Sequence, residues 1–132
     1  MKLIDKIAWL ELNNGSILST RSKGKDVFYI PGGKREQQET DAQTLIREIK
    51  EELNIFILPD TIEYVGTFQA QAHGHESGIE VKMSCYKSGY TGTITASSEI
   101  EEVVWLTYQD RSKVSPVDML IFDWLKQEEL LR

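Results

Sequence analysis

The sequence predicts a single α/β domain, because apolar residues recur with two different periods along one chain of 132 residues. Short apolar stretches bounded by Gly, Asn and Pro are typical of strands, whereas apolar steps of three and four are typical of helices. Both patterns occur, with strand-like stretches on either side of one helical segment and a second helical segment near the end. No internal repeat or change of composition divides residues 1–132, which are expected to form one domain.

The first strands are expected to form a hairpin. Asn13-Asn14-Gly15 separates the apolar residues 2–12 from residues 16–20, and Asn-Gly readily supplies the positive φ angles of a type I′ turn. Residues 27–30 are then expected to form a short strand. That strand would lead into Pro31-Gly32-Gly33, whose composition favours a tight turn.

A helix is expected next, ending before Asn54. Thr40 or Asp41 can cap its N-terminus, and Asn54 stands where a residue in the left-handed region is wanted. Its apolar residues recur at helical steps, so one face is expected to be buried. That face consists of Ala42, Leu45, Ile46, Ile49 and Leu53.

The second half of the chain is expected to add three strands and a closing helix. The strands cover residues 62–72, 79–88 and 102–107, and a polar loop that contains His73 and His75 joins the first two. Ser115-Pro116 is an N-cap followed by a proline in the first turn of the closing helix. The expected apolar stripe of this helix consists of Val117, Leu120, Ile121, Trp124 and Leu125.

Composition narrows the class of partner. A formal charge of −6 argues against binding a nucleic acid polymer, since the one small basic group, Arg21, Lys23 and Lys25, is confined to a short loop. A small polyanionic ligand would need metal ions to approach an acidic pocket. The single cysteine, Cys85, lies in an apolar alternation and is expected to be buried. We see no leader-like segment and no long apolar run, so no membrane partner and a cytoplasmic location are expected.

Three carboxylates crowd one face of the first helix. Glu48, Glu51 and Glu52 lie three and four residues apart, a spacing at which like charges cost a few tenths of a kcal/mol per pair. A solvated acidic face is the simple interpretation. A bound cation is the alternative, because it would make the crowding favourable.

The residues around these carboxylates favour the cation. Gly33, five residues, Glu39, seven residues and then Arg47-Glu48-Ile49-Lys50-Glu51-Glu52 resemble the Nudix box of the Nudix hydrolases. Asn54 stands where that family has Gly, and Asn also tolerates the left-handed backbone. The resemblance implies the Nudix fold, a mixed β-sheet sandwiched between α-helices.

The resemblance also implies a metal site and catalytic residues. Glu48, Glu51, Glu52 and the carbonyl of Gly33 would bind Mg²⁺, for which Mn²⁺ could substitute. A fourth carboxylate would come from Glu99, six residues before Trp105, with Glu101 and Glu102 as solvated neighbours. Arg47 and Glu39 would form a charge pair that orients the box, and Glu51 or Glu48 would be the general base.

The implied substrate is a small nucleotide. Markers of the nucleoside-sugar, dinucleotide and coenzyme A subgroups are not evident, which leaves the MutT-like enzymes that cleave nucleoside triphosphates to the monophosphate and pyrophosphate. Hydrolysis of nucleoside diphosphate sugars or dinucleotides, and nucleotide binding without hydrolysis, stay open as alternatives, as do monomer and homodimer. The candidate substrate contacts are Arg21, Lys34, Phe28, Tyr29 and Asp118, although the two aromatic residues suit a core and Asp118 suits a helix N-terminus equally.

Overall fold

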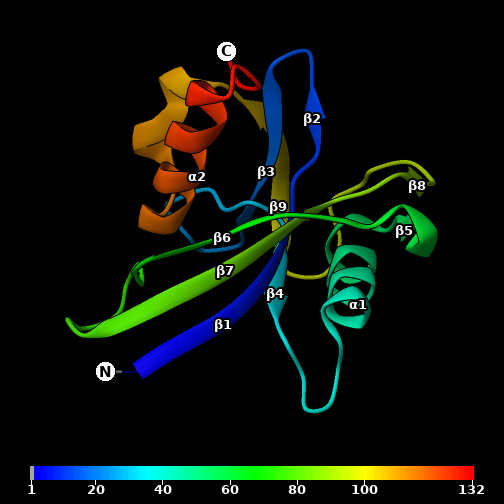
Figure 1. Ribbon diagram of the computed structural model, residues 1–132, viewed down its shortest axis with the longest axis horizontal. Coiled ribbons are helices and arrows are strands. Elements are labelled where there is room, and N and C mark those ends of the chain that lie inside the picture. Colours follow the sequence, from blue (N-terminus) through cyan, green and yellow to red (C-terminus); the bar gives the residue numbers. More distant parts are fainter. Residues whose placement is uncertain (1) are drawn as a thin grey trace.

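The computed structural model describes residues 2–132, whose helices and strands are shown in Figure 1. The strands are β1 (Lys2–Trp9), β2 (Leu12–Asn13), β3 (Ser16–Ser22), β4 (Gly32–Lys34), β5 (Phe56–Ile57), β6 (Glu63–Gln71), β7 (Ile79–Lys87), β8 (Tyr90–Thr91) and β9 (Ile100–Leu106). The helices are α1 (Asp41–Leu53), α2 (Pro116–Gln127) and the short 3₁₀ turns η1 (Pro59–Thr61) and η2 (Tyr108–Lys113).

The strands form a mixed sheet and a smaller antiparallel sheet between the two α-helices. The four-stranded sheet has the order β4-β1-β7-β6, in which β1 and β7 are parallel and the other pairs antiparallel. The three-stranded sheet has the order β2-β3-β9, and a two-stranded ribbon joins β5 to β8. Figure 1 shows α1 and α2 on opposite sides of these strands. The predicted α/β fold with helices on both sides is therefore confirmed.

The turn between β2 and β3 has the expected conformation. Asn14 and Gly15 have φ angles of 54° and 78°, and Asn13 pairs with Ser16 across the turn. Two consecutive positive φ angles are the requirement of a type I′ turn, whose twist matches that of the flanking strands. The predicted turn is confirmed, but only Leu12 and Asn13 pair with β3 across it, whereas residues 2–9 form β1 of the other sheet.

The predicted strand at residues 27–30 is wrong. Phe28 donates its backbone N–H to Lys113 at 2.9 Å, whereas Tyr29 exchanges backbone bonds of 2.8 Å with Thr20. Because neighbouring residues bond to different partners, no continuous ladder forms, and only isolated bridges are present here within residues 2–132. The strand of this region is β4, which comes after Pro31 and pairs with β1.

Helix α1 begins and ends as its sequence indicates. Thr40 is the N-cap, and its hydroxyl accepts the N–H of Gln43 at 3.1 Å while the Gln43 side chain accepts the N–H of Thr40 at 2.9 Å. This reciprocal capping box satisfies two donors that the helix cannot. At the other end Asn54 has φ 56° and ψ 37°, and its side chain accepts a hydrogen bond from Lys50 at 2.9 Å. The box therefore keeps its left-handed turn without glycine.

The two helices cover separate parts of the core. Leu45, Ile49 and Leu53 of α1 are fully buried against one side of the sheets, whereas Ala42 and Ile46 are only partly covered. Cys85 is buried on the α2 side, as expected.

The expected stripe of α2 is only partly correct. Val117, Ile121 and Leu125 are buried and Trp124 packs on Phe68 with ring centroids 5.9 Å apart. Leu120, however, is 41% exposed, and Phe122 occupies the core instead. A buried helix face spans more than one row of residues, so a helix with apolar residues on several sides leaves its orientation undetermined.

Replacing Asn54 by alanine is expected to lower the free energy of unfolding by about 1 kcal/mol, because a left-handed residue with a Cβ and no local hydrogen bond is unfavourable. Asn54→Gly, the control, should match the natural chain within about 0.5 kcal/mol. Equilibrium unfolding in urea measures both. An alanine variant as stable as the natural chain would show that the turn does not need a residue tolerant of positive φ.

Candidate active site

Arg47 joins the loop after β4 to helix α1. Its Nε and Nη2 donate to the two carboxylate oxygens of Glu39 at 2.7 and 2.9 Å, and Nη2 also donates to the carbonyl of Lys34 at 3.1 Å. The hydrogen bonds from Arg47 are the main reason why the pKa of Glu39 is lowered to about 2. The Glu39 carboxylate in turn raises the pKa of Arg47. A bidentate guanidinium–carboxylate pair fixes the relative orientation of the two side chains as well as their distance. Arg47 and Glu39 are therefore brought together as the sequence indicated.

Glu52 and Glu48 of α1 both contact β4. Glu52 is only 7% exposed, and its Oε1 accepts the N–H of Gly32 at 3.1 Å. Burial, reinforced by the negative charges of Glu48 and Glu99, raises the pKa of Glu52 to about 8. Such a carboxyl group is poorly stabilised as an anion unless a positive charge comes near it.

Glu48 lies directly against Gly33. A Cβ on Gly33 would be 2.3 Å from Oε2 of Glu48, so any larger residue would displace this carboxylate. The Glu48 side chain is 15% exposed, and Arg47 donates to it at 3.2 Å. Burial raises the pKa of Glu48, while the Arg47 charge opposes that shift. The close approach explains why glycine is needed at this point of the turn.

Glu99 reaches the same region from the segment before β9. The backbone N–H groups of Thr95 and Ser97 donate to the last carbonyls of α1, those of Leu53 and Glu52, at 2.9 and 3.0 Å. These carbonyls have no partner inside the helix, so the segment satisfies them and is held at the helix end. Glu99 thereby stands close enough for its charge to raise the pKa of Glu48 and Glu52.

Glu51 occupies a different position from the other acidic residues of the box. Its side chain is 52% exposed and lies 3.6 Å from Arg47, outside the cavity wall that Glu48 and Glu52 help to form. Among residues 2–132, no three His, Cys, Asp or Glu side chains converge closely enough to hold a metal ion by themselves. The expected three-glutamate cluster is thus open, with Glu51 on its outer side.

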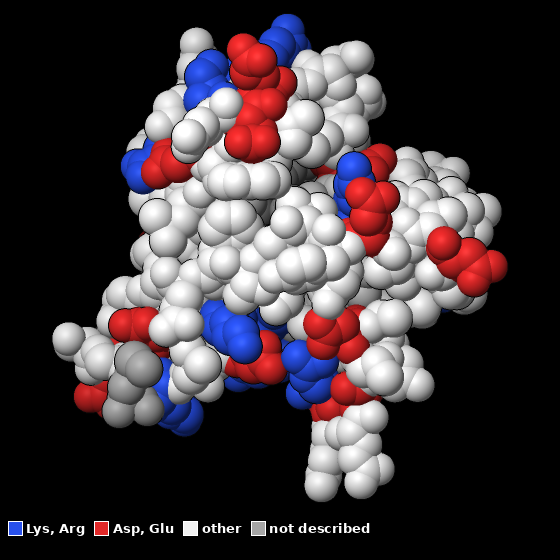
Figure 2. All heavy atoms as spheres, viewed as in Figure 1, with Lys and Arg blue, Asp and Glu red and all other residues white. Residues whose placement is uncertain are grey.

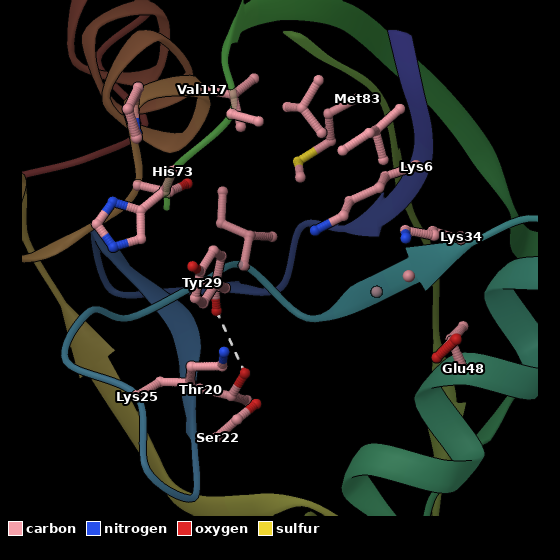
Figure 3. A pocket seen from close by; sticks show the side chains of 18 of the residues that line it. Lys6, Thr20, Ser22, Lys25, Tyr29, Lys34, Glu48, His73, Met83 and Val117 are labelled. Atoms are coloured by element: carbon pink, nitrogen blue, oxygen red, sulfur yellow. Dashed lines mark hydrogen bonds between the residues drawn. The ribbon is translucent and has the colours of Figure 1, made fainter. Parts of the chain in front are cut away.

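Glu48, Glu52 and Glu99 form part of the wall of a cavity of about 390 Å³. Figure 3 shows Glu48 on the α1 side and Lys6 and Lys34 on β1 and β4, with Tyr29 and His73 farther from α1. Apolar side chains of β1, β7 and α2 line another part of the wall. These are Ile4, Val81, Met83 and Val117. The cavity thus presents anionic, cationic and apolar surfaces to a single ligand.

The other candidate substrate contacts are distributed unevenly. Lys34 and Tyr29 line the cavity, whereas Arg21 is outside the lining and donates to Glu102 at 2.9 Å. Phe28 packs against the core beside α2. Asp118 has no exposed surface and accepts the N–H of Ile30 at 2.8 Å, so its carboxylate lies behind the wall, where burial raises its pKa to about 7.

Lys6 was not among the residues singled out from the sequence. It lines the cavity from β1, on the same strand face as Ile4 and Ala8, because side chains two residues apart share a face. A lysine between two residues that face the core is an unusual element of a strand. The alternation of Lys6 with Ile4 and Ala8 could have indicated this position from the sequence. This inference needs the buried face of the strand to be known first.

The fold consists of a mixed sheet and an antiparallel sheet between two helices. The site adds a loop–helix–loop segment, rich in carboxylates, at one end of a cavity. Together they indicate an α/β enzyme. The family model of the NUDIX domain matches residues 5–125, so the chain belongs to the Nudix family. It is a Nudix pyrophosphohydrolase, and the enzymes of this family generally use a divalent metal.

Solved structures agree with this fold. The E. coli ORF135 protein is 28% identical, with 96% of this chain and 92% of that chain covered and a TM-score of 0.73. The MutT protein of Methanosarcina mazei Go1 is 18% identical over 97% and 96% of the two chains, with a TM-score of 0.75. A putative Nudix hydrolase of Chromobacterium violaceum is 20% identical over 96% and 78%, at 0.73. The last two support the fold alone.

Curated protein sequences contain no match to the chain. No helix within residues 2–132 is long and apolar enough to cross a membrane.

Glu39 is expected to make stability depend on pH in acid. Its pKa is about 2 in the folded state against 4.5 as the ordinary value, so the folded protein resists its protonation. The stabilising contribution is present above pH 4.5 and is lost as pH falls towards 2. Glu39→Gln lacks this contribution, so between pH 7 and pH 3 its free energy of unfolding should fall less than that of the natural chain, when measured by urea unfolding.

Glu76→Gln is the matched control, because Glu76 is an exposed glutamate of the β6–β7 loop. This variant should follow the natural chain. Parallel declines for the natural chain and Glu39→Gln would contradict a role for the Arg47–Glu39 pair in stability.

Proposed function

We propose that this Nudix hydrolase cleaves a diphosphate linkage in a nucleoside triphosphate, in the presence of Mg²⁺, to yield the monophosphate and pyrophosphate. The observation that supports this most is the single cavity that combines carboxylates, lysines and an apolar wall. A nucleotide has the complementary parts, since its base is largely apolar on its faces and its phosphates carry negative charge. The metal would join the phosphates to the carboxylates.

The residues present fit a hard divalent cation. Glu48, Glu52 and Glu99 offer oxygen ligands on the wall of one cavity, and the buried Glu52 has no ion-pair partner among residues 2–132. The carbonyl of Gly33 is proposed as a further ligand, since Gly33 lies directly against Glu48. Mg²⁺ keeps several waters and commonly uses one or two carboxylates together with substrate phosphates, so it does not require a closed cage. Mn²⁺ accepts the same oxygen ligands.

We propose that the protein's own groups orient the substrate and accept a proton. Bound Mg²⁺ would neutralise phosphoryl oxygens and make a water more acidic. Glu51 is the first candidate general base, because its half-exposed carboxylate is open to water. Glu48 is the second candidate. Arg47 holds the loop and α1 in register while the proton moves.

Substrate contacts are proposed on the cavity wall. Lys34 is placed to meet a phosphate, and Tyr29 offers an aromatic ring beside the apolar surface. Arg21, Phe28 and Asp118 would act on the shape of the wall, Asp118 through its bond to Ile30. Figure 2 shows Lys and Arg interspersed with Asp and Glu on the face in view, with no continuous basic stripe for a polymer.

Nucleotide binding without hydrolysis is the alternative from another class. It would be favoured by loss of an acidic residue of the box, yet Glu39, Glu48, Glu51 and Glu52 are all present. Hydrolysis of a nucleoside diphosphate sugar or a dinucleotide would use the same carboxylates and differ only in the group beyond the second phosphate.

Replacing Glu48 or Glu52 by glutamine is expected to lower Mg²⁺-dependent turnover by about 100-fold or more, because each change removes an anionic oxygen at the proposed metal site. Glu99→Gln should also lower turnover. Glu101→Gln is the matched control, since Glu101 is an exposed neighbour on the same segment, and it should leave turnover unchanged. Pyrophosphate release measures all four variants. Full activity of Glu48→Gln and Glu52→Gln would rule out the proposed site.

A substrate screen tests the reaction itself. Nucleoside triphosphates, nucleoside diphosphate sugars and dinucleotides are incubated with Mg²⁺ or with EDTA, and products are separated by chromatography. At least one triphosphate should yield monophosphate and pyrophosphate only with Mg²⁺. Cleavage of a sugar or dinucleotide derivative alone would move the assignment to that class, and binding without any cleavage would favour the non-hydrolytic alternative.

A further inference from the structure

Lys6 and Lys34 form a like-charged pair on the wall of the cavity. They are direct partners in the antiparallel pairing of β1 and β4, and both line the cavity. Directly opposite residues of an antiparallel pair point to the same face of the sheet, where like charges are destabilising. A pair of this kind costs folding stability unless something between the two ammonium groups offsets it.

Neither lysine forms an ion pair in the part of the chain that the structure describes. Within residues 2–132, neither ammonium group has a carboxylate within 4.0 Å, the distance at which ion pairs such as Arg21–Glu102 occur elsewhere in the chain. The ammonium group of Lys6 lies over the ring of Tyr29, 5.6 Å from its centroid. Burial lowers the pKa of Lys6, and Lys34 adds to that shift, whereas the nearby charges of Asp118, Glu52 and Glu48 oppose it. Carboxylates therefore lie near Lys6, but neither lysine has a direct ion-pair partner among the described residues.

The position of the pair indicates which anion would bind. Figure 3 shows Lys34 between Lys6 and Glu48, with Tyr29 and His73 farther from α1. A group held between them would lie next to the carboxylates Glu48 and Glu52, where the metal is proposed. A phosphate has several acceptor oxygens and enough charge to meet two ammonium groups, and lysine ammonium groups bind phosphate as compact point charges.

We propose that Lys6 and Lys34 together bind one phosphate group of the substrate across β1 and β4, which makes Lys6 a substrate-binding residue. The proposal rests on the proposed function, because it assigns a second cation to the diphosphate part of that substrate. It also predicts that the charge of Lys6 lowers the stability of the ligand-free protein while it strengthens phosphate binding. Removing the Lys6 charge relieves repulsion in the empty protein and weakens the phosphate-bound one.

The test uses inorganic pyrophosphate as the ligand, with EDTA present so that no metal contributes. Calorimetric titration gives the affinity, and a thermal melt of the ligand-free protein gives Tm. Lys6→Met should bind pyrophosphate about tenfold more weakly or worse, as expected for a lost charge-assisted hydrogen bond, while its ligand-free Tm stays equal or rises. Lys6→Arg keeps the charge and should retain part of the affinity.

Lys82→Met is the matched control. Lys82 lies on β7 one residue before the partner of Lys6, so it points to the other face of the same sheet and does not line the cavity. This variant loses the same charge and should keep the affinity of the natural chain. A loss of affinity equal to that of Lys6→Met would show that only net charge matters and would overturn the proposal.

Three further outcomes would overturn the proposal. Unchanged pyrophosphate affinity in Lys6→Met would mean that Lys6 contacts another part of the ligand, such as the base. A natural chain that does not bind pyrophosphate would exclude a phosphate site at the pair. A lowered ligand-free Tm in both Lys6→Met and Lys6→Gln, with normal affinity in the folded fraction, would assign Lys6 a structural role.

This experiment is independent of turnover. If the substrate screen finds no hydrolysis but Lys6→Met loses pyrophosphate affinity, the lysine pair stands and the proposed reaction fails. If hydrolysis occurs and Lys6→Met shows unchanged affinity and unchanged KM, the reaction stands and the lysine pair fails.

Discussion

The arrangement of the candidate site depends on the guanidinium group of Arg47. It donates to Glu39 through two nitrogens, to Glu48 and to the carbonyl of Lys34, so a loop and a helix are joined at one point. Arg35 also ties this loop to β1 and α1 through Asp5 and Asp41, but the contacts of Arg47 are the ones that reach the carboxylates of the site. The guanidinium group also reduces the repulsion among the glutamates of α1, which would otherwise favour a more open helix face.

The cavity separates its charges in space. Carboxylates come from α1 and from the segment before β9, whereas lysines come from adjacent strands of the mixed sheet. Opposite charges are kept far enough apart that Lys6 and Lys34 do not simply form ion pairs with Glu48 and Glu52. A site built in this way retains unpaired charge of both signs, which is unfavourable in an empty protein and favourable once a ligand with complementary charges is bound.

The sequence allowed the parts of the fold that depend on local chemistry to be predicted. The Asn14-Gly15 turn, the Thr40 cap and the left-handed Asn54 each follow from the backbone preference of one or two residues. The strand expected at residues 27–30 failed for the opposite reason. Its composition suits a strand, but whether it pairs depends on β3 and on the segment before α2, which lie elsewhere in the chain.

The site was predictable to the same extent. Glu48, Glu52 and Arg47 share one helix, so their relative positions follow from helical geometry. The position of Glu99 could be predicted only from the resemblance to the Nudix hydrolases. Lys6 is related to Lys34 through strand pairing, which no local pattern reveals. Leu120, which was expected in the buried stripe, is exposed and Phe122 is buried, because α2 has apolar residues on more than one side.

The place of β1 in the mixed sheet has a consequence for how the chain acquires its structure. Strand β1 is internal, and its parallel partner β7 pairs Lys2 with Ile79 and Trp9 with Tyr86. Ribosomes synthesise β1 first, so this largely apolar strand has no β7 to pair with until most of the chain has emerged. Pairings between residues so distant in sequence slow folding. The mixed sheet can therefore form only after β7 has been made, even though the finished domain is small.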